Sequence, residues 1–282
     1  MKKQTKKSLS WATLLLPVAV LLILLTTGTL PTKCSGPEAE NLSETATETA
    51  TESSSEASGL PAPTETNKNA MNMKIPKVPS ATSFFDDLDR DPGAFDYHTV
   101  GNVNWPDEFP AHPDVRFVIA HTGGSVLIKF YVSEDYTLAA VAEDNGPVWT
   151  DSCVEFFIAF DDTGYYNLET TCIGKALLGW RQSRDVFTHA DDATLASIRR
   201  SSSLGTEPFA ERQGQSWEMD IEIPASAFFG HTITDLSGKR ARGNFYKCGD
   251  NMTAPQFLSW SPIDNPTPNF HLTEFFGGLE FE

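Results

Sequence analysis

The 282-residue chain contains 21 basic and 38 acidic side chains, which give a formal net charge of −17. Five of the lysines lie in residues 1–36, where there is no acidic residue, so residues 37–282 carry a net charge of −22. Because nucleic-acid affinity depends largely on Lys and Arg that neutralise phosphates, this excess of acid excludes nucleic acid as an expected partner.

An uncharged and mostly apolar segment follows four lysines at the N-terminus. Its span from Trp11 to Leu30 has 20 residues, about the length that crosses ~30 Å of hydrocarbon as a helix. Lysines before this span predict that the rest of the chain is exported. Residues 1–36 are therefore predicted to be a signal anchor or transmembrane helix, or else a signal peptide cleaved near Thr27. Lipidation of Cys34 is disfavoured, because the preceding Lys33 is not a small residue.

Residues 37–70 consist almost entirely of Glu, Thr, Ser, Ala and Pro. Such a segment cannot bury enough apolar surface to offset the entropy of ordering, so we expect a disordered linker. Together, the N-terminal segment and this linker predict an exported domain of the cell envelope. The domain would be either anchored to the membrane, or periplasmic or extracellular.

From residue 71 to residue 282 the sequence has the pattern of an all-β domain. Trp217 to Ile223 alternates apolar and acidic residues, which indicates a strand with one buried face. From Ser152 to Phe160 both the odd-numbered and the even-numbered positions are largely apolar, which predicts a central strand covered on both sides. Together with further strands, these predict one two-layer antiparallel β-sandwich, jelly-roll-like, with short helical turns near 191–198 and 225–229. The other expected strands are 115–121, 126–132, 165–173, 176–183, 241–248 and 278–281.

The three cysteines of this domain, Cys153, Cys172 and Cys248, have none of the spacings of a zinc motif. We expect buried free thiols, or one disulfide with the third thiol left unpaired.

The segment from Asp144 to Phe157 places a tryptophan after a polar turn and a glutamate inside an apolar strand. With Ser216–Pro224 and Leu258–Leu279 downstream, it resembles the family 9 carbohydrate-binding modules and the related DOMON-like sandwiches of exported bacterial proteins. The resemblance covers most of residues 75–282. It implies a β-sandwich that binds a terminal sugar between two tryptophans, with a glutamate, an arginine and amides on the hydroxyls.

Carried over to this chain, the resemblance implies that Trp149, Glu155 and Trp260 bind the ligand, with Arg181 as the arginine; Asn244 completes the predicted ligand-binding set. A pyranose packs its C–H face on an aromatic ring, and planar polar groups bind its hydroxyl edges. Arg242 is the alternative arginine, and strand alternation alone suggests Asn244. The alternative roles are core packing for both tryptophans and a structural ion pair for Glu155.

A loop with Asp161 and Asp162 before Gly164 offers oxygen ligands for a calcium ion, the one cofactor that the sequence suggests. A plain hairpin turn explains the same residues.

Three classes of function fit these features. The first is non-catalytic binding of a glycan or oligosaccharide, in the context of carbohydrate catabolism. The second is a glycoside hydrolase or its accessory domain, since two carboxylates suffice for that reaction. The third is a haem-binding DOMON-like domain that uses His121 and Met219, or a scaffold without a ligand.

Overall fold

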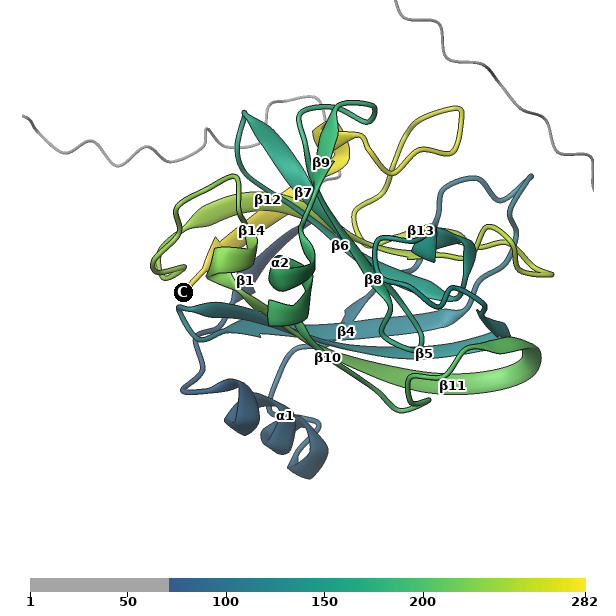
Figure 1. The fold of residues 1–282 in the computed structure, drawn as a ribbon, viewed down its shortest axis with the longest axis horizontal. Coiled ribbons are helices and arrows are strands. Elements are labelled where there is room, and N and C mark those ends of the chain that lie inside the picture. The colour runs from purple at the N-terminus through teal and green to yellow at the C-terminus, as the bar shows by residue number, and fades with distance from the viewer. Residues whose placement is uncertain (1–70) are drawn as a thin grey trace, which may run out of the picture. The chain divides into compact units, whose positions relative to one another are not determined.

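The computed structural model describes residues 71–282 (Figure 1). The predicted N-terminal helix and linker, residues 1–70, lie outside the described residues. Within the described part of the chain, no helix has both the length and the apolar character that crossing a membrane requires.

The domain is built from two β-sheets, which confirms the predicted β-sandwich (Figure 1). The smaller sheet has five strands, and all of its neighbouring pairs are antiparallel. In spatial order they are β10 (Arg199–Ser202), β11 (Phe209–Pro224), β5 (Ser125–Ala139), β4 (Asp114–His121) and β2 (His98–Thr99).

The larger sheet has nine strands, and its main path runs β1-β14-β12-β6-β7-β8-β9. β13 pairs with β12, and β3 pairs with β13. β1 pairs with β14 in parallel, whereas β14 pairs with β12 antiparallel. The bounds are β1 (Asn72–Ile75), β3 (Asn102–Val103), β6 (Cys153–Asp161), β7 (Gly164–Thr171), β8 (Ala176–Arg181), β9 (Phe187–His189), β12 (Arg240–Cys248), β13 (Phe257–Ser259) and β14 (Gly277–Phe281).

Helix α1 (Ala81–Arg90) covers the side of the five-stranded sheet that faces away from the nine-stranded sheet (Figure 1). A reciprocal capping box between Ser80 and Ser83 begins it, and Phe84 packs among apolar residues of β4 and β5. The sequence analysis did not predict this helix, because most of its length is polar and only three of its residues are buried.

The short helical turns that the sequence predicted are present. Asp191 caps α2 (Asp192–Ser197) by accepting a hydrogen bond from Thr194 N. The second turn is the 3₁₀ helix η2 (Ala225–Ala227). Two further 3₁₀ turns are η1 (Val148–Thr150) and η3 (Thr273–Phe275).

Strand β6 has no solvent-facing side over most of its length. Its even-numbered residues, such as Phe156, lie in the main core with residues of both sheets. Its odd-numbered residues, such as Phe157, lie in a second cluster that includes Trp105, Ile263 and Phe270. Side chains alternate between the two faces of a strand, so Glu155 lies on the same outer face as Phe157.

A buried ion pair connects the two sheets inside the main core. Lys247 Nζ on β12 lies 2.9 Å from Glu134 Oε2 on β5, and both side chains are fully buried. The other carboxylate oxygen, Glu134 Oε1, accepts a hydrogen bond of 2.7 Å from Trp217 Nε1 on β11. A buried charge that loses its partner is strongly destabilising, so this pair depends on both members.

We expect Lys247→Met to lower the free energy of unfolding by about 3–5 kcal/mol, because Glu134 would stay buried without its cation. Adding Glu134→Gln should recover part of that loss, since the amide oxygen still accepts from Trp217 without carrying a charge. Urea unfolding of the two variants and the wild type measures both effects. A double variant no more stable than the single one would show that charge burial is not the cause.

Candidate functional site

A pocket of about 430 Å³ lies on the outer face of the nine-stranded sheet. Three neighbouring strands contribute charged side chains to it: Glu155 from β6, Glu169 from β7 and Arg181 from β8. The remaining lining residues come from η1, from the loop after β8, from the end of β12 and beyond, and from β13 and the segment after it: Trp149, Arg184, Asp185, Cys248, Asp250, Phe257, Pro268, Asn269, Phe270 and His271.

Two glutamates form the charged centre of this pocket. Glu155 and Glu169 are directly opposite in the β6–β7 register, and they are 3% and 4% exposed. Glu155 Oε1 accepts a hydrogen bond of 2.8 Å from Cys248 Sγ, and Glu169 Oε1 accepts one of 2.8 Å from Asn167 Nδ2. Glu169 Oε2 is buried and has no hydrogen-bond partner among residues 71–282.

Burial disfavours the charged form of three carboxyl groups in the pocket, those of Glu155, Glu169 and Asp250. It raises the pKa of Glu169 to about 7, although Asn167 and Arg181 oppose the change. The pKa of Glu155 is raised well above its usual value, first by burial and then by the charge of Glu169. Burial also raises the pKa of Asp250 to about 6. Near neutral pH Glu169 can therefore both donate and accept hydrogen bonds.

Arg181 is held in one orientation at the side of the pocket. Its Nε donates to Asn167 Oδ1 at 2.8 Å, and its Nη1 donates to the carbonyl oxygen of Arg184 at 2.5 Å. Its guanidinium carbon lies 4.3 Å from the centre of the Phe187 ring. Asn167 therefore links Arg181 to Glu169 in one polar chain, and Nη2 of Arg181 keeps no partner among the described residues.

His271 contributes an uncharged imidazole to this pocket. Burial and the charges of Arg181 and Arg184 lower its pKa to about 3. One ring nitrogen, Nδ1, lies 2.9 Å from the Tyr165 hydroxyl. The imidazole is therefore uncharged near neutral pH and can bind a neutral ligand without desolvating a charge.

Trp149 places a large aromatic surface at the pocket and is 40% exposed. The residue before it, Val148, is fully buried and anchors η1. The backbone of Asp250 donates to Trp149 O at 3.2 Å, and that of Asn251 donates to Thr150 O at 3.0 Å. The indole is thus exposed on a turn whose backbone is tied to the loop after β12.

The predicted slot between Trp149 and Trp260 is not formed. Trp260 is 2% exposed, lies in the main core, and contacts Phe245 edge-to-face at 5.8 Å between ring centroids. Its backbone nitrogen donates to Phe245 O at 2.9 Å, which aligns the chain after β13 with β12. Trp260 therefore packs in the core, as the alternative reading of the sequence held.

Asn244 is also structural. Strand alternation placed it on the correct face of β12, but the chain around Ser261 covers it and leaves it fully buried. Its Nδ2 donates to Ser261 O at 3.0 Å, and its Oδ1 accepts from Ser261 N at 2.9 Å. The competing arginine, Arg242, lies elsewhere and pairs with Asp162.

The loop suggested for calcium forms a hydrogen-bonded turn. Asp161 Oδ1 accepts hydrogen bonds from the backbone and the hydroxyl of Thr163, and its Oδ2 lies 3.2 Å from His231 Nε2. Asp162 lies 3.0 Å from Arg242 Nη2. Neither aspartate belongs to a group of three candidate metal ligands among the His, Cys, Asp and Glu side chains of residues 71–282, and both are engaged by neighbouring residues as in a hairpin turn.

The residues considered for haem ligation are committed to the protein itself. His121 is fully buried; its Nε2 lies 2.8 Å from the backbone oxygen of Glu282, and its Nδ1 accepts from Gly123 N at 3.1 Å. Met219 is fully buried in the main core. Neither side chain faces the pocket.

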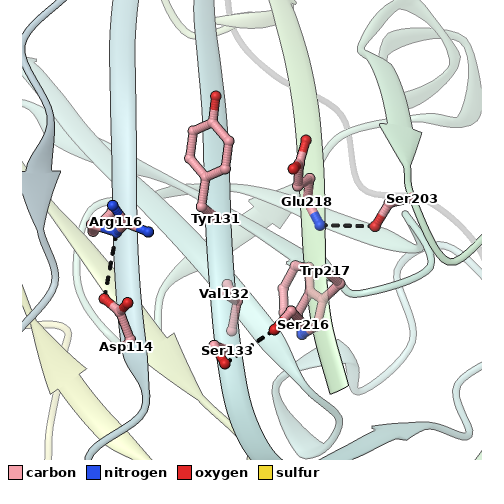
Figure 2. A pocket seen from close by; sticks show the side chains of 9 residues that line it. All are labelled: Asp114, Arg116, Tyr131, Val132, Ser133, Ser203, Ser216, Trp217 and Glu218. Atoms are coloured by element: carbon pink, nitrogen blue, oxygen red, sulfur yellow. Dashed lines mark hydrogen bonds and ion pairs between the residues drawn. The ribbon is translucent and has the colours of Figure 1, made fainter. Parts of the chain in front are cut away.

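A second hollow, of about 400 Å³, lies on the outer face of the five-stranded sheet (Figure 2). Its polar groups pair with one another: Arg116 with Asp114, Ser216 with Ser133, and Glu218 N with Ser203. None of its lining residues has a buried side-chain atom without a partner among the described residues, whereas Glu169 Oε2 of the first pocket is such an atom. The pocket around Glu155 is therefore the better candidate site.

Several pocket residues were absent from the set read from the sequence. Glu169 has a usable signal, since it is the one acidic residue of β7 and, in a hairpin, lies opposite Glu155. Asp250, Phe270 and His271 lie in loops, where no periodicity indicates which way a side chain faces.

The chain belongs to carbohydrate-binding family 9, whose family model matches residues 87–281. This match confirms the resemblance seen in the sequence. A solved structure from Bacteroides uniformis, described as a "putative carbohydrate-binding protein", is 40% identical with a TM-score of 0.71, and the match covers 76% of this chain and 100% of that one.

Two solved structures of a family 9 module from Caldicellulosiruptor kristjanssonii, in complex with glucose and with cellotriose, are each 10% identical to this chain. Their TM-scores are 0.44 and 0.45, and the matches cover 75% of this chain and 96% and 94% of those chains. Structural similarity at that level supports no conclusion about this chain. No curated protein matches the sequence.

The raised pKa of Glu169 predicts a pH-dependent stability that Glu169→Gln removes. The folded-state pKa of about 7 exceeds the ordinary value of 4.5, so the folded protein binds more protons than the unfolded chain between these values. The stabilisation is present below pH 4.5 and is lost as pH rises through 7. Relative to wild type, the variant should gain roughly 2–3 kcal/mol between pH 5 and pH 8.

Urea unfolding at both pH values measures this difference. The same substitution at the exposed Glu207 is the control. A parallel pH dependence in wild type and Glu169→Gln would contradict the assignment.

Proposed function

We propose that this chain binds a carbohydrate without transforming it, in the pocket lined by Trp149, Glu155, Glu169 and Arg181. The observation that carries the proposal is an exposed indole beside two buried carboxyl groups and an oriented guanidinium, all lining one pocket. The description of the Bacteroides uniformis relative and the family to which the chain belongs support the same assignment.

The chemistry of the pocket suits a sugar ring. The C–H face of a pyranose packs on an exposed aromatic surface such as Trp149. Sugar hydroxyls donate and accept hydrogen bonds, and the pocket offers both kinds of partner. Glu169 Oε2 can accept, because it has no hydrogen-bond partner within residues 71–282, and the Arg181 guanidinium donates. A hydroxyl that donates to Glu169 Oε2 would relieve the cost of burying that atom alone.

This pocket differs from the two-tryptophan slot in having one exposed indole. Phe257, Phe270 and His271 supply its other ring surfaces. A ligand held mainly by polar groups on one side and a single ring on the other should depend strongly on the arrangement of its hydroxyls.

Export and tethering form the second part of the proposal. The lysines and the apolar span of residues 1–36 support insertion into or passage through a membrane, and the composition of residues 37–70 supports a linker. The domain would then collect poly- or oligosaccharide outside the cytoplasm in the context of carbohydrate catabolism. Proteolysis of intact cells tests this, since an exported domain should be degraded without lysis.

A glycoside hydrolase is the second candidate, because Glu155 and Glu169 are neighbouring carboxyls with raised pKa values, as catalytic acids often are. Binding is favoured because one oxygen of each is occupied, Glu155 by Cys248 and Glu169 by Asn167. Release of a chromogenic aglycone that is abolished in Glu155→Gln would favour the hydrolase instead.

We expect Trp149→Ala and Glu155→Gln each to weaken sugar binding at least about tenfold, which corresponds to about 1.4 kcal/mol. The first removes the stacking surface, and the second removes a hydrogen-bonding carboxyl. Isothermal titration against a panel of mono- and oligosaccharides measures the affinities.

Phe229→Ala is the matched control, because Phe229 is an exposed aromatic residue (37%) that does not line this pocket. It should leave the affinity unchanged. Absence of binding by the wild-type chain to every glycan on a broad array would refute the proposed function.

A further inference from the structure

Two thiols and a carboxylate converge beside the pocket, which Glu155 and Cys248 line and Cys153 does not. Cys153 and Glu155 are two residues apart on β6 and therefore share its outer face. Cys248 lies directly opposite Cys153 on β12. One ligand atom from each of the three residues lies within 4.8 Å of the other two, and no other group of this kind occurs in residues 71–282.

We propose that Cys153, Glu155 and Cys248 form a binding site for Zn²⁺ or another soft divalent metal ion. Thiolates together with one carboxylate suit zinc, whereas calcium and magnesium take oxygen ligands. The site does not depend on sugar binding, although it shares Glu155 with the proposed sugar pocket.

The separations suit a tetrahedral ion with small adjustments. Zn–S bonds of about 2.3 Å and Zn–O bonds of about 2.1 Å place tetrahedral ligands roughly 3.6–3.8 Å apart. Cys248 Sγ is now 2.8 Å from Glu155 Oε1, because the thiol donates to the carboxylate. An ion that displaces this proton would move the two atoms apart by less than about 1 Å.

The pocket borders this group, and Glu169 lines the pocket without belonging to the group. Glu169 lies opposite Glu155 on β7. Its Oε2 is buried without a partner, and its side chain lines the same pocket as Cys248 and Glu155. An ion can therefore enter through the pocket, which supplies the path that a metal site requires. A water molecule that enters from the pocket would complete the coordination.

The third cysteine of the domain has a different environment. Cys172 lies in the main core, where its thiol donates to Leu138 O at 3.5 Å, and it belongs to no such group. Comparison of the three cysteines therefore separates a metal site from the general reactivity of buried thiols.

The test uses the full-length chain, reduced and stripped with a chelator, and titrated with ZnCl₂ by calorimetry and with CoCl₂ by absorption. We expect one equivalent of each ion to bind, and Co²⁺ to produce thiolate charge-transfer absorption. Cys153→Ser and Cys248→Ser should each weaken Zn²⁺ binding by more than about a hundredfold, since even the loss of an outer partner costs 10–100-fold. Cys172→Ser should bind as the wild type does.

The cobalt spectrum of the wild type needs no variant to fold, so it tests the site even if a serine variant is unstable. Three results would overturn the proposal: no saturable binding of one equivalent, a thiolate spectrum that persists in both Cys153→Ser and Cys248→Ser, or a Cys153–Cys248 disulfide in the protein before reduction that re-forms in air despite added Zn²⁺.

Discussion

Burial of β6 on both faces is the constraint on which the rest of the domain depends. Its even-numbered residues pack between the sheets, and its odd-numbered residues pack under the chain that follows β12. A polar side chain on such a strand loses water and needs a partner inside the protein or on a ligand. Glu155 is in that position, and Glu169 is opposite it on the neighbouring strand.

Two buried carboxyls side by side are costly, and the domain tolerates them with specific partners. Cys248 and Asn167 each occupy one oxygen, and Arg181 is oriented toward the same polar chain. The remaining cost appears as raised pKa values and as an unpartnered oxygen. Natural proteins retain such conflicts mainly at functional sites, which fits a pocket that a ligand completes.

The core treats polar groups differently. Lys247 and Glu134 form a closed pair, and Trp217 donates to the same carboxylate. Asn244 likewise bonds to both backbone groups of Ser261. These residues satisfy one another and leave little for a ligand. Polar groups of this kind connect the layers of the domain, whereas Glu169 Oε2 is a buried oxygen without a hydrogen-bond partner among the described residues that lines the pocket.

The sequence alone was sufficient for the β-sandwich, because alternation in segments such as Trp217–Ile223 follows directly from the two-residue period of a strand. It also indicated three pocket residues, Trp149, Glu155 and Arg181, which local pattern and family resemblance place near strand ends or inside strands. It missed Glu169, although the hairpin between β6 and β7 carries that information in its register.

Only the tertiary structure decided the positions of Trp260 and Asn244. Both lie where the chain after β13 folds back along β12, and hydrogen bonds between distant residues determine which side chain that chain covers. The sequence by itself determined which residues alternate and which are apolar, because those properties are local. Only the packing of loops such as 268–271 decided which face of the sheet became a pocket. A loop has no repeating pattern in its sequence that would indicate which way its side chains point.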